Sequence, residues 1–291
     1  MKNNPINYIS IGNRLRAYRI AESLRAEQVA ENLGISRAAV YRLEKGEIVK
    51  IETLEKLADL LNTSLSSLLG VSSEYYSNAD GFFERMRQLE DSSEKIYAHF
   101  EPFSYLLTSK NYDTYLAKML MDSAPKGLLS EKQRSTLSIL EERKNTINSR
   151  PPRLFNLISL QSIQRILHTG LVGSLNLPPS TKIDRILQAR NELIHLINII
   201  EGKQHLANIA ISIKTIPSLT FQIFYNQQGA SSLAVSPFRL GEFPNITNGI
   251  ASVTNSEEAI SRYRHLFDNL WEHAAKGEDA INLLKRTLDD Y

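Results

Sequence analysis

The sequence predicts two structural classes in one chain. The first is an all-α N-terminal domain of five helices. The second is a C-terminal α+β domain whose small, mainly antiparallel sheet is flanked by helices. Apolar residues recur at helical spacing up to about residue 70, whereas the segment 71–81 is polar and has no period. Beyond residue 207 the apolar period changes to two, as expected of strands.

Five short helices are expected within the first 70 residues. Ile11 and Leu15 lie on the apolar face of the first helix. Gly34 ends the second helix, and Ser36 is a suitable N-cap for the third. Two further helices extend to residue 69, so that residues 1–72 are predicted to form one domain.

The middle of the chain is predicted to be helical. Residues 73–127 are expected to act as a linker and helical connector, with amphipathic helices between residues 82 and 122. Ser130 and Gln133 have the spacing of a capping box that begins the next helix. A helix over 182–201 is apolar on most sides, which predicts burial.

The final part, residues 128–291, is predicted to hold the α+β domain. A strand is expected after the prolines at 151–152, and a fourth alternating strand near 248–253. The alternating residues of the first three strands are Ile209, Ile211 and Ile213, then Phe221, Ile223 and Tyr225, then Leu233 and Val235. Thr254 and Glu257 are expected to cap the helix that follows.

The composition is that of a globular protein. Hydrophobic residues make up 42% and charged residues 23% of 291 residues, and there is no cysteine. Disulfides, thiolate zinc sites and cysteine nucleophiles are therefore excluded. No apolar run reaches 18 residues and no signal peptide is evident, so we expect a cytoplasmic protein, on the nucleoid when bound to DNA, and no membrane partner.

The third helix has two different faces. At about 100° per residue, its basic and small side chains fall on one side and its apolar ones on the other. The first set is Arg37, Ala38, Tyr41, Arg42 and Lys45, and the second is Ala39, Val40 and Leu43. Arginine can bond guanine in the major groove bidentately, with roughly 1–3 kcal/mol of discrimination. The alternative to DNA binding is a helical hairpin that only packs and whose basic face is exposed to solvent.

Residues 11–69 resemble the Cro/repressor-type helix-turn-helix family, also called the XRE family. The resemblance rests on "IGNRLRAYR", "AEQVAENLGISRAAVYRLEKG" and "LEKLADLLNTSLSSLL". It implies sequence-specific binding to a double-stranded DNA operator through the helix at 36–46. It assigns base-facing positions to Arg37, Ala38, Tyr41 and Arg42, and backbone-facing positions to Lys45 and Lys50, with Ser36 at the start of the helix.

Two residues depart from the family pattern, and one pair follows it. Arg25 and Ala26 stand where relatives have a capping Ser or Thr and a DNA-contacting Gln, so Arg25 would supply a charge in place of those contacts. The resemblance also implies a partly buried ion pair between Arg19 and Glu44. We expect this pair to stabilise the fold and to play no part in reading DNA.

The sequence offers little catalytic chemistry. None of the six histidines forms a metal-binding pair, and no nucleotide-binding or hydrolase motif is present, so we predict no enzyme, metal or cofactor. A loop at 236–245 and nearby strands suggest an anion-binding effector site. Its candidate residues are Phe238, Arg239, Tyr225 and Trp271.

These observations predict a transcriptional regulator that binds a palindromic operator as a homodimer. The C-terminal domain would sense a small-molecule effector. The helices at 82–122 and 182–201 are the candidate dimer interfaces. The alternative is an antitoxin-like or phage-type repressor whose C-terminal domain only dimerises or binds a protein partner. The third hypothesis is an enzyme that the helix-turn-helix domain directs to DNA.

Overall fold

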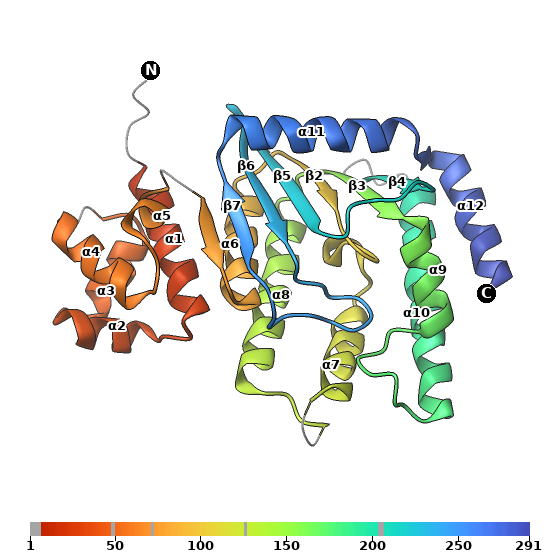
Figure 1. Cartoon of the computed structure of the whole chain (residues 1–291), viewed down its shortest axis with the longest axis horizontal. Helices are drawn as coiled ribbons and strands as arrows, with labels where there is room; N and C mark the ends of the chain where they lie inside the picture. Colours follow the sequence, from red (N-terminus) through yellow and green to blue (C-terminus); the bar gives the residue numbers. More distant parts are fainter. Residues whose placement is uncertain (1–6, 48–49, 71–72, 125–126, 203–206) are drawn as a thin grey trace.

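A computed structural model describes residues 7–47, 50–70, 73–124, 127–202 and 207–291. Helices at one end of the molecule are followed by a sheet packed between helices (Figure 1). The helices at that end are α1 (Tyr8–Ala21), α2 (Ala26–Leu33), α3 (Arg37–Glu44), α4 (Ile51–Leu60) and α5 (Leu65–Leu69). They agree with the five helices that the sequence predicts.

Eight strands of the described chain form one mixed sheet. Their order is β1-β7-β6-β5-β2-β3-β4-β8, and only β2, β3 and β4 are mutually parallel. The strands are β1 (Glu74–Tyr76), β2 (Lys95–His99), β3 (Arg153–Ser159), β4 (Ala207–Ser212), β5 (Thr220–Asn226), β6 (Gly229–Ser236), β7 (Ala251–Thr254) and β8 (Ala275–Lys276). The prediction of a small sheet is therefore wrong in size. The sheet is mixed, since five of its seven described strand pairs are antiparallel and the two that join β2, β3 and β4 are parallel.

The parallel strands explain the long helical stretches between them. A parallel pair needs a crossover connection, and helices run between β2 and β3 and between β3 and β4. The helices of this part are α6 (Ala79–Asp91), α7 (Tyr112–Asp122), α8 (Glu131–Ser149), α9 (Leu160–Thr169), α10 (Pro179–Glu201), α11 (Glu257–Glu272) and α12 (Gly277–Asp290), with a short 3₁₀ helix at Tyr105–Leu107. Ser130 caps α8 through the predicted capping box with Gln133.

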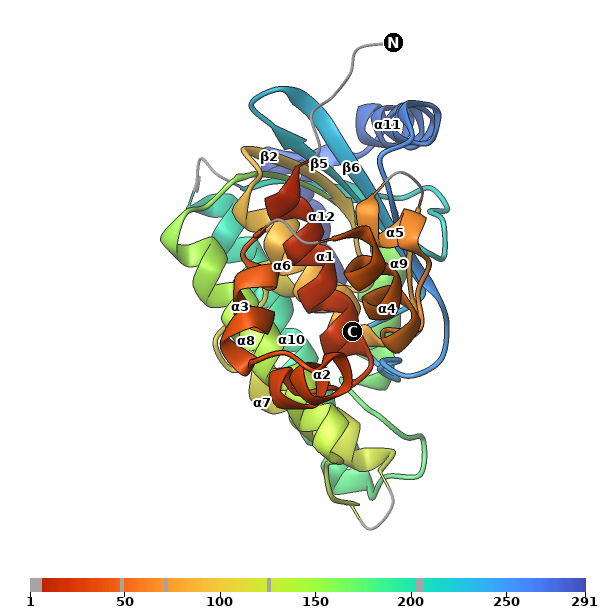
Figure 2. The ribbon, with the colours of Figure 1, turned by 90° about the vertical axis from the view of Figure 1, so that its left-hand side faces the viewer.

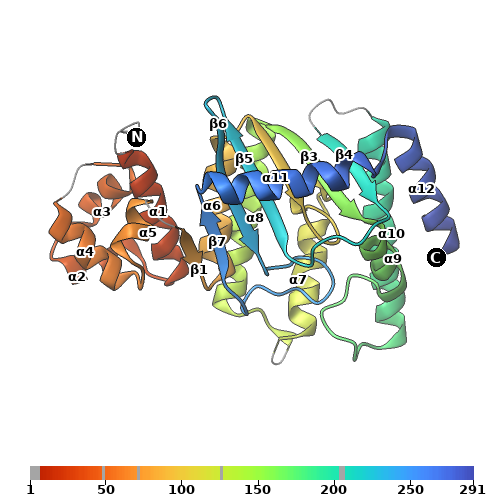
Figure 3. The ribbon, with the colours of Figure 1, turned by 45° about the horizontal axis from the view of Figure 1, so that its top comes forward.

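Helices cover both faces of the sheet. Figure 3 shows α11 crossing one face, while α6, α8, α9 and α10 lie against the other. Under α11, Tyr97, Phe267 and neighbouring apolar residues form a separate core. The cap of α11 differs from the prediction: the Ser256 side chain accepts from the Ala259 N–H, whereas Thr254 ends β7.

The larger core is continuous between the N-terminal helices and the sheet. Tyr18 of α1 stacks on Tyr76 of β1 at a ring-centroid distance of 4.9 Å, and Tyr76 contacts Phe82 of α6. Gly81 of α6 lies so close to α1 that a Cβ there would be 2.4 Å from the Cβ of Ala21. The N-terminal helices are thus packed directly on the rest of the chain.

A buried charge network reinforces this contact. Arg85 of α6 donates to both oxygens of Glu74, at 2.8 and 3.0 Å, and the Tyr76 hydroxyl donates to the same carboxylate at 2.8 Å. Arg14 of α1 lies 3.7 Å from Glu74 and donates to the carbonyls of α5. This network joins α1, α5, β1 and α6.

Residues 73–127 do more than connect two parts. They contribute β1 and β2 to the sheet, and α6 is almost entirely buried between α1 and α8. In the described chain α6 is therefore covered and offers little surface to a second copy. For the rest of residues 82–122, which include α7, the dimer interface stays a prediction. The domain limits at residues 72 and 127 remain a prediction.

Candidate DNA-binding surface

The turn between α2 and α3 follows from two residues. Gly34 adopts φ of +66°, in the left-handed region that glycine enters without steric cost, and ends α2. The Ser36 side chain then accepts from the Ala39 N–H at 3.1 Å and caps α3. Gly12 lets α3 approach α1, since a Cβ there would be 2.5 Å from the Glu44 carbonyl oxygen.

The two faces of α3 agree with the helical count. Val40 is fully buried, and Ala39 and Leu43 are half-buried against the other N-terminal helices. All eight predicted DNA contacts are exposed, namely Arg25, Ser36, Arg37, Ala38, Tyr41, Arg42, Lys45 and Lys50. Figure 2 shows α2 and α3 turned toward the viewer, on the side away from the sheet.

The two arginines of α3 have acidic neighbours that sequence reasoning missed. Arg37 Nε lies 2.8 Å from Glu27 Oε1, and Arg42 Nε lies 3.0 Å from Glu47 Oε2. The Arg37 guanidinium also lies over the Tyr41 ring, at 5.4 Å. Exposed pairs of this kind are weak, so both arginines can exchange their carboxylates for groups on DNA.

The cationic residues at the helix ends surround this face. Arg25 precedes α2, and its backbone N–H donates to Gln28 Oε1 at 2.7 Å. Lys45 is the C-cap of α3, and Lys50 is the N-cap of α4. Helix N-termini and nearby cations are the groups that hold backbone phosphates.

The ion pair between Arg19 and Glu44 is present. Arg19 Nε lies 2.5 Å from Glu44 Oε1, and Arg19 Nη1 donates to the Leu24 carbonyl at 2.9 Å. Glu44 is buried on the inner side of α3. The pair therefore fixes α3 against α1 without using the exposed face.

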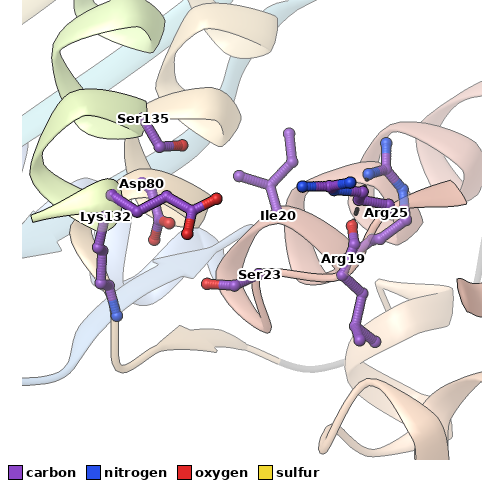
Figure 4. Close-up of a pocket in the computed structure, with 9 residues that line it drawn as sticks. Arg19, Ile20, Ser23, Arg25, Asp80, Lys132 and Ser135 are labelled. Atoms are coloured by element: carbon purple, nitrogen blue, oxygen red, sulfur yellow. Dashed lines mark hydrogen bonds between the residues drawn. The ribbon is translucent and has the colours of Figure 1, made fainter.

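A cleft of about 460 Å³ lies between the turn after α1 and the start of α8. Figure 4 shows Ser23 and Arg25 on one side of it, and Asp80, Lys132 and Ser135 on the other. Burial raises the pKa of Asp80, partly offset by the Gly81 N–H and by Lys132. The cleft thus combines the exposed Arg25 and the half-buried Lys132 with a carboxyl group that is protonated more readily than usual.

The predicted effector residues do not lie together. Phe238 is buried against Phe82 and Phe83 of α6, whereas Arg239 is exposed. Tyr225 and Trp271 belong to the aromatic cluster under α11. None of these four side chains lines the 460 Å³ cleft. In the described residues, no group of three or more His, Cys, Asp or Glu side chains could hold a metal ion.

One comparison with known proteins supports the N-terminal part. A family model described as "Helix-turn-helix domain" matches residues 10–76. Among solved structures, TrmBL2, an archaeal chromatin protein whose structure is described as showing a novel mode of DNA binding, aligns at a TM-score of 0.34 and 12% identity. The alignment covers 77% of this chain and 60% of that one. No curated protein matches the chain.

Residues 10–76 therefore form a helix-turn-helix domain, and this domain supports a role in DNA-binding regulation. No helix in the described chain has the length and apolar character needed to cross a membrane.

Proposed function

We propose that the protein is a sequence-specific transcriptional regulator of the XRE, or Cro/repressor, type, and that it is not an enzyme. The observation that carries this proposal is the division of α3 into a buried apolar side and an exposed basic side. Arg37 and Arg42 read base edges in the major groove, with Ala38 and Tyr41 beside them. Arg25, Ser36, Lys45 and Lys50 hold the backbone.

The operator is palindromic and the protein binds it as a homodimer. The support is physical, because a single small module contacts few base pairs and two linked modules gain avidity. The helix α10 keeps an exposed apolar stripe of Ile183, Leu187 and Ile194. Since α10 lies at the end opposite the helix-turn-helix domain (Figures 1 and 3), half-sites joined through it lie several helical turns apart.

A small-molecule effector modulates DNA binding. The 460 Å³ cleft supports this part of the proposal, because it is lined by the helix-turn-helix domain and by α6 and α8. A ligand that contacts both sides of the cleft binds with different affinity to different orientations of α3 relative to α6 and α8. Such a difference in affinity is the requirement for allosteric control.

The alternative is a repressor whose C-terminal part binds a protein partner and no effector. The α10 stripe is equally compatible with it, since exposed apolar side chains on one helix face indicate an interaction site for a second copy or for another protein. Its three residues lie within about 40° of one another around the helix.

The DNA-binding proposal is tested by fluorescence anisotropy on a duplex of mixed sequence. Arg37→Gln/Arg42→Gln is expected to weaken binding about tenfold, since each lost cationic contact costs about threefold. Arg262→Gln/Arg286→Gln removes the same charge from exposed sites on α11 and α12 and should bind like the parent. Equal affinities for all three proteins would refute the assignment of α3.

A further inference from the structure

A second groove lies directly beside α3, the helix proposed to enter the major groove. It has a volume of about 320 Å³ and runs between α3, α1 and α6. Its polar lining includes Tyr41 and Lys45 of α3, Asn13 and Arg16 of α1, and Arg87 and Gln88 of α6. Figure 2 shows these three helices next to one another. Tyr41 and Lys45 thus belong both to the proposed DNA-contacting face and to this groove.

One buried carboxylate holds both arginines in place. Glu84, only 1% exposed, accepts from Arg87 Nε at 2.9 Å and Nη2 at 2.8 Å, and its Oε1 lies 3.1 Å from Arg16 Nε. Burial would raise the pKa of Glu84, but Arg87 and Arg16 outweigh it and lower the pKa below its usual value. The carboxylate is therefore ionised at neutral pH. It orients the Arg87 guanidinium through two hydrogen bonds, whereas Arg16 lies at ion-pair distance and its Nε makes no hydrogen bond to the described residues.

The groove has excess positive charge. Two guanidiniums share one carboxylate at Glu84, and Arg16 is 42% and Arg87 19% exposed. Glu44 also lines the groove, but Arg19 neutralises it. Among the described residues, Lys45 forms no ion pair and adds a further charge. The site is thus prepared for an anion, with the side-chain amide of Asn13 nearby as a further donor. The Gln88 amide already donates to the Asn13 carbonyl and to Glu84, so it helps to fix the groove.

We propose that this groove binds a backbone phosphate of the DNA that α3 contacts, so that α6 is part of the DNA-binding surface. The inference rests on the proposed function. A major groove about 12 Å wide is flanked by phosphates on both sides of an inserted helix, and Arg16 and Arg87 stand on one flank of α3. Arg87 lies outside the matched domain at 10–76, so the sheet-containing part contacts DNA directly.

The test is the salt dependence of duplex binding by the full chain. The slope of log K against log salt is negative, and each neutralised phosphate adds about 0.9 to its magnitude. Arg87→Gln is therefore expected to lower the magnitude of that slope by about 0.9 and to weaken binding about threefold on every sequence alike. Arg262→Gln, a matched loss of one arginine on α11, is expected to match the parent.

A second variant guards against a merely structural effect of losing Arg87. Asn13→Asp is isosteric and adds a carboxylate to the groove, so it should weaken binding and lower the magnitude of the slope without removing an ion pair. Parent-like slopes for both Arg87→Gln and Asn13→Asp, with Arg37→Gln/Arg42→Gln still impaired, would overturn the phosphate site and leave the proposed function standing. A parent that binds no duplex would overturn both.

Discussion

Arg19 of α1 and Glu44 of α3 form an ion pair with two contacts, Nε to Oε1 at 2.5 Å and Nη2 to Oε2 at 3.2 Å. Their side chains are 12% and 6% exposed. The same arginine donates to the Leu24 carbonyl, so it ties the turn before α2 to both helices. The position of α3, and with it the position of its exposed basic side, depends on this ion pair.

Glu44→Ala is expected to destabilise the protein by roughly 3 kcal/mol, because Arg19 would be left buried without its partner. Urea unfolding followed by circular dichroism measures the change. Glu47→Gln, which breaks the exposed pair with Arg42, is the control and should shift stability by less than about 1 kcal/mol. A Glu44→Ala midpoint equal to that of the parent would contradict the structural role of the pair.

Glu74→Gln is expected to cost roughly 4 kcal/mol, since it leaves the buried guanidinium of Arg85 without a counter-charge. The loss should loosen the contact between α1 and α6, so that calorimetry shows two transitions where the parent shows one. Glu258→Gln, whose partner Arg262 is exposed, serves as the control. A single transition at the parent temperature would show that the network does not couple the two parts.

His99 is expected to make stability depend on pH below about 7. Burial lowers its pKa, and the carbonyls of Leu157 and Pro217 offset this only in part. In the unfolded chain the His99 imidazole has a pKa near 6.5. Below that pH the unfolded chain binds more protons than the folded chain, so the free energy of unfolding falls as the pH decreases.

The variant His99→Gln should therefore lose less stability than the parent when the pH is lowered from 7 to 5.5. His265→Gln, at an exposed position on α11, should follow the parent curve. Urea midpoints at each pH measure the effect. Identical pH slopes for His99→Gln and the parent would mean that His99 titrates alike in both states.

Leu187→Asp is expected to prevent self-association through α10. Ile183, Leu187 and Ile194 are 59%, 52% and 43% exposed, and a charge placed among them would have to be desolvated in the contact. Sedimentation at micromolar concentration measures the change, with Ile250→Asp, at another exposed isoleucine, as the control. A monomeric parent would rule out the homodimer.

The helix-turn-helix domain was predictable because its signals are local. Gly34, Ser36 and the apolar period of each helix lie within a few residues of the structure they determine. Even Arg19 and Glu44 could be paired by family resemblance. The exposed acidic partners Glu27 and Glu47 were missed, because charge pairing on a surface leaves no periodic signal.

The sheet was harder to predict because its pairing is not local. The strands β1 and β8 have three and two residues, too short for alternation to be recognised. The strand β2 follows α6 closely, and its parallel partner β3 lies beyond two helices. The groove at Arg16 and Arg87 depends on packing between α1 and α6, which no spacing in the sequence reveals.

Recognition of DNA sequence by α3 is tested most directly by selecting bound duplexes from a random pool with the full chain. The parent is expected to enrich one sequence pattern, repeated with inverted symmetry, and Arg37→Gln/Arg42→Gln is expected to lose that pattern. Enrichment of the same pattern by both proteins would contradict the reading face on α3.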